Sequence, residues 1–240
     1  MLENTIRPAV AEFIGTFTLI FVGAGSIIAA HGIEDPSLIG IALAHGLAIG
    51  VMVAVYARVS GAHFNPAVTF GFVLTRRIKP GLAVVYWVAQ LAGAAVAALL
   101  LRELLPSSET EAVNLGVPAL GHGVKSGAGV VLEGILTFLL VTVVFGTAVD
   151  PKGAFKSIAA LAIGLTISID ILIGGPYTGA AMNPARAFGP QLVGNHWENG
   201  WVWYVGPVVG GAIAAVLYEW LYLPARSKEE PPPVAEGIAE

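Results

Sequence analysis

The hydrophobic pattern divides the chain into long apolar segments separated by short polar connections. Six of these segments are long enough to cross a bilayer, since a transmembrane helix needs about 20 apolar residues. They lie near residues 8–30, 37–59, 80–103, 126–149, 155–175 and 200–223. The first is too long for a secretory signal and has no basic leader followed by a cleavage site, so we expect it to remain as a span.

Two further apolar stretches, 60–79 and 176–199, are too short to span twice. Each holds an Asn-Pro-Ala motif, formed by Asn65, Pro66 and Ala67 in the first and by Asn183, Pro184 and Ala185 in the second. Proline suits the first position of a helix, and asparagine suits the N-cap before it. We therefore expect short helices near 66–74 and 184–192, each about 14 Å long or half a bilayer.

The two motifs belong to an internal repeat. The motifs and their neighbours match at an offset of 118 residues, Glu12 matches Glu133 at 121, and Gly93 matches Gly210 at 117. Each half has three spans, so the second half must insert upside down relative to the first. The two short helices then enter the membrane from opposite faces, and their N-termini meet near its midplane.

This inverted repeat, with halves at about 7–105 and 126–223, places irregular backbone inside the membrane. Such backbone is tolerated only where it is buried or lines water. The residues before each asparagine would lay unpaired carbonyls along a pathway: Gly61, Ala62, His63 and Phe64 in the first half, and Gly179 to Met182 in the second.

Composition agrees with a membrane protein. Hydrophobic residues make up 56% of the chain and charged residues 12%, about half of the charged fraction of a soluble domain. High hydrophobicity also excludes disorder of the whole chain. Cysteine is absent and the five histidines lack metal spacing, so we expect no metal and no other cofactor. A net charge of -4 gives no basic surface for nucleic acid.

Basic residues predict the orientation. They gather in connections on one side of the membrane, at Arg7, at Arg76, Arg77 and Lys79, at Lys152 and Lys156, and at Arg226 and Lys228. The positive-inside rule places that side, and both termini, in the cytoplasm. We expect a multi-pass integral protein of the cell (plasma) membrane, with a single channel domain over 1–225 and a short disordered cytoplasmic tail over 226–240.

Six spans, an inverted repeat and two Asn-Pro-Ala half-helices together resemble the aquaporin (major intrinsic protein) family over roughly residues 8–223. The segments GAHFNPAVT at 61–69 and MNPARAFGP at 182–190 are similar to its signatures. The resemblance implies an all-α membrane protein with six transmembrane helices and two re-entrant half-helices in an inverted repeat. It also implies a homotetramer in the lipid bilayer whose subunits each pass water and exclude protons and ions.

The resemblance implies a selectivity filter formed by His45, Ile171, Ala180 and Arg186. Strictly water-selective members carry an aromatic residue at the first of these positions and a histidine at the second. The combination found here is similar to the vacuolar (tonoplast intrinsic) branch of the family. It implies a filter that passes water and also ammonia or other small neutral solutes.

Four further residues have roles that the sequence leaves partly open. His122, in the connection before the fourth span, either joins the filter, as in some vacuolar-type relatives, or is a solvated loop histidine. By resemblance, Glu12 and Glu133 brace the re-entrant segments and are structural. Asp170 either pairs with a basic group or faces a subunit interface.

Three alternatives remain to be weighed. An aquaglyceroporin-like channel would conduct glycerol or urea, but glycerol-selective members place aspartate after the second motif's arginine, where this chain has Ala187. A secondary transporter also uses inverted repeats, but no coupling carboxylate lies near either motif. An intramembrane enzyme would need a catalytic motif, and the chain has neither H-E-x-x-H nor G-x-S-x-G. We therefore expect a channel and not an enzyme.

Overall fold

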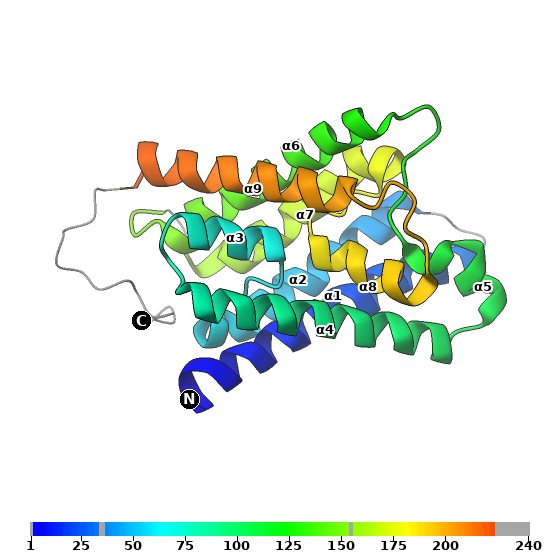
Figure 1. Ribbon diagram of the computed structural model, residues 1–240, viewed down its shortest axis with the longest axis horizontal. Helices are drawn as coiled ribbons and strands as arrows, with labels where there is room; N and C mark the ends of the chain where they lie inside the picture. The colour runs from blue at the N-terminus through cyan, green and yellow to red at the C-terminus, as the bar shows by residue number, and fades with distance from the viewer. Residues whose placement is uncertain (1, 34–36, 154–155, 224–240) are drawn as a thin grey trace.

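A computed structural model describes residues 2–33, 37–153 and 156–223, and the regular secondary structure of these residues is entirely helical (Figure 1). Six of its helices are long and apolar enough to cross a membrane. They are α1 (Arg7–Gly32), α2 (Leu38–Ser60), α4 (Pro80–Leu104), α6 (Ser126–Val144), α7 (Ala159–Thr178) and α9 (Val202–Leu221). They fall within a few residues of the expected spans, so the all-α transmembrane fold class is confirmed; the tail expected over 226–240 lies outside the described residues.

Two short helices, α3 (Pro66–Leu74) and α8 (Pro184–Gly194), occupy the stretches that contain the Asn-Pro-Ala motifs. Figure 1 shows them end to end between α4 and α9. Each packs against a span of the opposite half, α3 on α9 and α8 on α4. This exchange ties the two halves together around the point where the short helices meet.

Smaller elements complete the described chain. A π-helical turn, Leu2–Ile6, precedes α1, and another, Phe145–Val149, continues α6. The connection between α4 and α6 folds into α5 (Ser107–Ala112) and a 3₁₀ turn, Asn114–Gly116, while a 3₁₀ turn at Lys156–Ile158 leads into α7. These short elements were not predicted from the sequence, because they are too short to carry a hydrophobic period.

The backbone that leads into each half-helix follows the same unusual course. α2 and α7 both end at a glycine in the left-handed conformation, with φ of 82° at Gly61 and 76° at Gly179, a common way to stop a helix. Left-handed backbone then recurs at four non-glycine residues, namely Ala62, Phe64, Ala180 and Met182. Each such residue costs of order 1–3 kcal/mol, so the surrounding structure must stabilise these segments.

A buried carboxylate stabilises the first segment. Glu12 of α1 is fully buried, and its Oε1 accepts hydrogen bonds from the Ser60 hydroxyl at 2.7 Å and from the His63 N–H at 2.9 Å. Its Oε2 accepts from the Phe64 N–H at 2.6 Å and from Gln90 Nε2 at 2.8 Å. These bonds satisfy backbone donors that have no helical partner, which would be costly to leave unpaired in the membrane.

Glu133 of α6 does the same for the second segment. Its Oε1 accepts from the Thr178 hydroxyl at 2.7 Å and from the Ala181 N–H at 2.9 Å, and its Oε2 accepts from the Met182 N–H at 2.7 Å. Each donor is the repeat equivalent of a donor to Glu12. The hydrogen bonds therefore follow the internal repeat of the sequence.

Glycines set the spacing of the long helices. α2 and α7 meet where Gly46 and Gly50 face Gly164, and a Cβ at Gly164 would lie 3.1 Å from the Gly50 Cα. α6 and α9 meet where a Cβ at Gly210 would collide with the carbonyl group of Gly134. Small residues allow such close backbone approach in the membrane, where apolar side chains gain little by leaving lipid.

We expect Glu133→Leu to lower the unfolding free energy by about 3 kcal/mol or more, because it strands two backbone N–H groups and one hydroxyl at about 1–3 kcal/mol each. The measurement is the thermal unfolding midpoint of the purified protein in detergent. Glu111→Leu, at an exposed acid of α5, is the matched control, with an expected change within about 0.5 kcal/mol. Equal effects of the two substitutions would refute the bracing role of Glu133.

We expect Gly210→Ala to destabilise the protein by about 1–3 kcal/mol, since the added methyl group forces α6 and α9 apart. Gly127→Ala, in the same α6–α9 layer but with open space around it, should leave the unfolding midpoint unchanged or raise it slightly, because alanine favours the helix. The same detergent unfolding assay measures both variants. A Gly210→Ala midpoint equal to wild type would show that this close approach is dispensable.

Candidate functional site

The two asparagines of the motifs cap their own helices and also reach across to the opposite half. Asn65 Oδ1 accepts from the Ala67 N–H at 2.8 Å, and Asn183 Oδ1 accepts from the Ala185 N–H at 2.9 Å. The amide Nδ2 of Asn65 donates to the Met182 carbonyl at 2.8 Å. In return, Asn183 Nδ2 donates to the Phe64 carbonyl at 2.9 Å. The four bonds hold both side chains rigidly at the meeting point of α3 and α8.

Each of these amides has one N–H left over. A side-chain amide carries two N–H donors, and only one from each asparagine is used by a carbonyl of the opposite half. Both asparagines line the same cavity. The site therefore presents two oriented donors to whatever occupies that cavity.

The cavity is about 1290 Å³ in volume, far more than the roughly 30 Å³ of one liquid water. Its lining includes the exposed residues Arg58 and Lys79, the two asparagines and the buried Arg186. Within the described chain, no aspartate or glutamate contributes to the lining. The cavity thus reaches exposed residues at Arg58 and Lys79. The charged residues of its described lining are all basic, and one of them, Arg77, forms an ion pair with Glu219.

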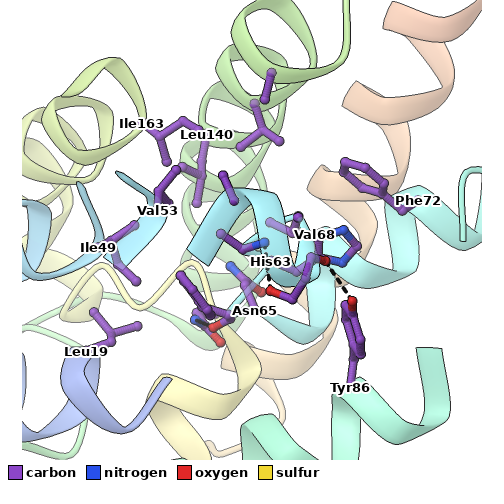
Figure 2. Close-up of a pocket in the computed structure, with 18 of the residues that line it drawn as sticks. Leu19, Ile49, Val53, His63, Asn65, Val68, Phe72, Tyr86, Leu140 and Ile163 are labelled. Carbon is purple, nitrogen blue, oxygen red and sulfur yellow. Dashed lines mark hydrogen bonds between the residues drawn. The ribbon is translucent and has the colours of Figure 1, made fainter. Parts of the chain in front are cut away.

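The two sides of the cavity wall differ in polarity (Figure 2). Leu19, Ile49 and Val53 lie on one side of the cavity, and the polar side chains of His63 and Asn65 lie across from them, beside Val68. A space with apolar groups on one side and some hydrogen-bonding groups on the other lets a small polar molecule pass without being held from all directions.

The carbonyl prediction needs two corrections. Gly61 to Phe64, Ala180, Ala181 and Met182 line the cavity, but Gly179 is not among the lining residues. The carbonyls of Phe64 and Met182 are not unpaired, because each accepts from the asparagine of the other half. The second lone pair of each carbonyl oxygen remains available. The sequence shows the equivalence of the halves but not the exchange between them.

Arg186 is a buried residue of the cavity wall. It is 2% exposed, its Nη1 donates to the Gly116 carbonyl at 2.7 Å, and its Nη2 lies 3.4 Å from His45 Nε2. Its Nε is buried and finds no partner among the described residues. A guanidinium carries five N–H donors, so Arg186 keeps donors for a permeating molecule.

His45 is held as the acceptor of this contact. Its Nδ1 lies 2.9 Å from the Ile41 carbonyl, which can only accept, so Nδ1 carries the proton and Nε2 offers its lone pair to Arg186. The ring has room because Gly23 of α1 faces it, where a Cβ would come within 2.5 Å of the imidazole. The imidazole thus orients the arginine, while its own polar atoms are largely occupied.

The other residues expected in the filter divide into two groups. Ile171 and Ala180 are buried and line the cavity beside His45 and Arg186. His122 is exposed and is absent from the lining of this cavity. The structure therefore brings together four of the five candidates and favours the solvated-loop interpretation of His122.

Neither expectation for Asp170 fits the structure. It is 1% exposed, so it does not lie on the outer surface where a subunit interface would be. Its Oδ2 is buried without a partner, and no basic group within the described residues forms an ion pair with it. It is also absent from the cavity lining.

Three contacts of the site were missed at the level of sequence. The Gly116 carbonyl accepts from Arg186. It belongs to the 3₁₀ turn Asn114–Gly116, in which Leu115 has a φ of 55°. Tyr86 donates its hydroxyl to the Ser60 carbonyl at 2.7 Å, and Trp203 donates its indole N–H to the Thr178 carbonyl at 2.8 Å. The last two donors are 117 residues apart, the offset of Gly93 and Gly210, so the repeat held a signal that could have paired them.

The chain is similar to known membrane channels over most of its length. Residues 2–218 match the family model described as "Major intrinsic protein". A "Probable aquaporin TIP3-2" of Arabidopsis thaliana is 48% identical, with 95% of this chain and 88% of that protein covered. "Aquaporin TIP1-2" of Zea mays is 45% identical, with coverages of 97% and 92%.

A solved structure has the same fold. The X-ray structure of the aquaglyceroporin from Plasmodium falciparum superimposes with a TM-score of 0.80 at 26% sequence identity, over 90% of this chain and 96% of that one. The six spans, the paired half-helices and these matches lead to one conclusion: the chain belongs to the major intrinsic protein family, the family of the aquaporins.

Proposed function

We propose that this chain is a passive transmembrane channel through which water moves in single file along the cavity. The observation that carries the proposal is the pair of N–H donors that Asn65 and Asn183 leave open at the meeting point of two half-helices. The aquaporins among its relatives support it. A family of channels gives no support to the enzyme and carrier alternatives.

Proton exclusion is explained by one water of the file, the central water, which lies between Asn65 and Asn183. The N-termini of α3 and α8 both point at it, and each contributes partial positive charge from its helix dipole. A water that accepts from Asn65 and Asn183 must direct its oxygen at them and its two hydrogens away, one toward each end of the cavity. It cannot accept a proton from a neighbour in that state, so proton transfer along the file stops there.

Cations are excluded by the same charges and by the lining. No acid belongs to the described wall, which carries Arg58, Lys79 and Arg186, while the charge of Arg77 is paired with Glu219. An entering cation that has lost hydration therefore meets a net positive charge. Neutral solutes feel no such barrier. The carbonyls of Gly61, Ala62 and His63 replace hydrogen bonds that a water leaves behind in bulk.

We assign selectivity among neutral solutes to Arg186, His45, Ile171 and Ala180. Ile171 makes one side of this filter apolar, which favours small neutral molecules such as ammonia beside water. The structural similarity to an aquaglyceroporin keeps glycerol or urea conduction as the alternative. Ala187, at the position after Arg186, is the feature of this chain that disfavours it.

The membrane and the assembly belong to the same proposal. The TIP-type relatives do not support the cell membrane expected from the sequence, and we assign the channel to a vacuolar-type internal membrane instead. Both termini are assigned to the cytoplasm in this proposal, because basic residues such as Arg76 and Lys79 gather in the connections on that side. We expect a homotetramer with one cavity in each subunit, as the family resemblance implies.

Proteoliposomes that contain the purified protein should shrink osmotically much faster than empty liposomes, with a weak dependence of the rate on temperature. We expect ammonia to permeate and glycerol and urea to remain largely excluded. Arg186→Val should keep water flux and raise urea uptake about tenfold, because a buried, charge-assisted donor worth about 1.5–3 kcal/mol no longer orders the filter. Stopped-flow light scattering measures each flux.

Lys125→Val is the control, since it removes an exposed positive charge outside the cavity lining, and all fluxes should stay at wild-type values. Rapid glycerol uptake by the wild type would favour the aquaglyceroporin alternative. Water flux no faster than in empty liposomes would contradict the channel.

Mercury should leave the wild-type channel open, because the chain has no cysteine. Ala180→Cys should make water flux mercury-sensitive and recoverable with excess thiol, since a mercury atom at this buried wall position narrows the file. Val88→Cys, on the outer face at 64% exposure, should bind mercury without loss of flux. Resistance of Ala180→Cys would place Ala180 away from the pathway, and inhibition of the wild type would show that mercury acts on a group other than a thiol.

A further inference from the structure

We propose that a buried relay from Glu12 through Gln90 and Thr69 fixes the His63 imidazole as a hydrogen-bond acceptor toward the water file. The relay would keep the wall of the inner half of the cavity, lined by Gly61 to Phe64, free of donors that oppose the water orientation set by the asparagines. The inference rests on the proposed function, because it concerns water in that cavity.

His63 is held rigidly at the wall. Its side chain is 8% exposed and lines the cavity. The ring packs on Phe72 with a centroid distance of 4.2 Å and meets Tyr86 edge-on at 5.3 Å. Nδ1 faces Thr69, 3.1 Å from its hydroxyl. Nε2 forms no hydrogen bond within the described chain and is not enclosed, so it is the polar atom of this ring that the file meets.

The relay begins at the carboxylate. Gln90 is fully buried, and its Nε2 lies 2.8 Å from Glu12 Oε2 and 3.1 Å from Thr69 Oγ1. A flipped amide would place its oxygen against the carboxylate, so the NH₂ group must face both oxygens. One lone pair of the Thr69 hydroxyl is therefore occupied by a hydrogen bond from Gln90.

The hydrogen bonds of the Thr69 hydroxyl determine which nitrogen of His63 carries the proton. Its Oγ1 lies 3.1 Å from the Asn65 carbonyl, which only accepts, and 3.1 Å from His63 Nδ1. A hydroxyl has one proton and two lone pairs. All three contacts of Thr69 are satisfied only if its proton goes to Asn65 and the Nδ1–H of His63 donates to it. The Nε2 of that tautomer carries a lone pair.

An acceptor is what the file requires at this place. The central water sends one hydrogen toward the inner half, and every following water there donates in the same direction. Wall groups that accept these hydrogens stabilise the file, as the carbonyls of Gly61 and Ala62 do. An Nε2–H group would instead compete for the water oxygens and favour the reverse orientation.

The second half of the repeat indicates that the relay is not needed to hold a re-entrant segment in place. The repeat equivalents of Gln90, Thr69 and His63 are Pro207, Ala187 and Ala181, none of which has a polar side chain. Glu133 nevertheless binds the equivalent Thr178 hydroxyl and backbone N–H groups. The re-entrant segment can therefore be held without such a relay, and the polar triad of the first half serves another purpose.

Imidazole ¹⁵N NMR of the full chain in lipid bilayers tests the tautomer. We expect an unprotonated Nε2 and a protonated Nδ1 at His63, with the signal assigned by its loss in His63→Gln. Thr69→Val should give a mixture of tautomers, and Thr69→Ser should restore the wild-type state because it keeps the hydroxyl. Thr16→Val is the matched control, since the Thr16 hydroxyl is equally buried but has no partner within the described residues.

Water flux of the same samples tests the consequence. Thr69→Val should lower the permeability per protein about two- to fivefold, the effect of weakening one hydrogen bond in the file, while Thr69→Ser and Thr16→Val stay near wild type. A wild-type Nε2–H signal, a Thr69→Val spectrum identical to wild type, or a changed tautomer with unchanged flux would each overturn the inference. A wild type without water flux would instead overturn the proposed function, and the spectra distinguish the two cases.

Discussion

Backbone polar groups in the middle of a bilayer must find partners within the protein, and the rest of this structure depends on how that demand is met. Two helices, α3 and α8, begin inside the protein after non-helical segments. The N–H groups of those segments have no helical partner, and the lipid offers no water to bind them. Glu12 and Glu133 accept hydrogen bonds from those N–H groups. Tyr86 and Trp203 donate hydrogen bonds to the carbonyls of Ser60 and Thr178, at the ends of α2 and α7. Only with this satisfied scaffold can left-handed residues such as Phe64 and Met182 persist and turn their polar atoms toward a pathway.

The exchange between the asparagines and the opposite carbonyls gives the site its rigidity. Each amide is committed on its oxygen side to its own helix and on one N–H to the other half. The remaining N–H has no freedom to follow a passing molecule, so the molecule must turn to it. Selection of orientation thus comes from fixed donors, which costs no reorganisation of the protein as each water passes.

Much of this arrangement could be predicted, because it depends on long apolar segments and on motifs that occur once in each half of the sequence. Apolar length predicted six spans, and Asn followed by Pro predicted the starts of α3 and α8 at Pro66 and Pro184. What could not be predicted depends on contacts between segments far apart in the chain. The Gly116 carbonyl that binds Arg186 sits in a turn with no hydrophobic period, and the exposure of His122 follows from the path of the same connection. Asp170 was interpreted from its chemistry alone, and both expectations were contradicted by its burial, with no ion pair and no partner for Oδ2 among the residues that the structure describes.

The contact between α2 and α7 is made by glycines, and His45 and Ile171, the residues that we propose for the filter, project from these same helices. The separation of the two helices is therefore set by main-chain contact at these glycines, which replacement of the His45 or Ile171 side chain does not alter. Mutations at the two filter positions can exchange one chemistry for another while the distance between the walls stays constant. Such an arrangement lets solute preference diversify among related sequences by single substitutions, without a correlated repacking of the scaffold.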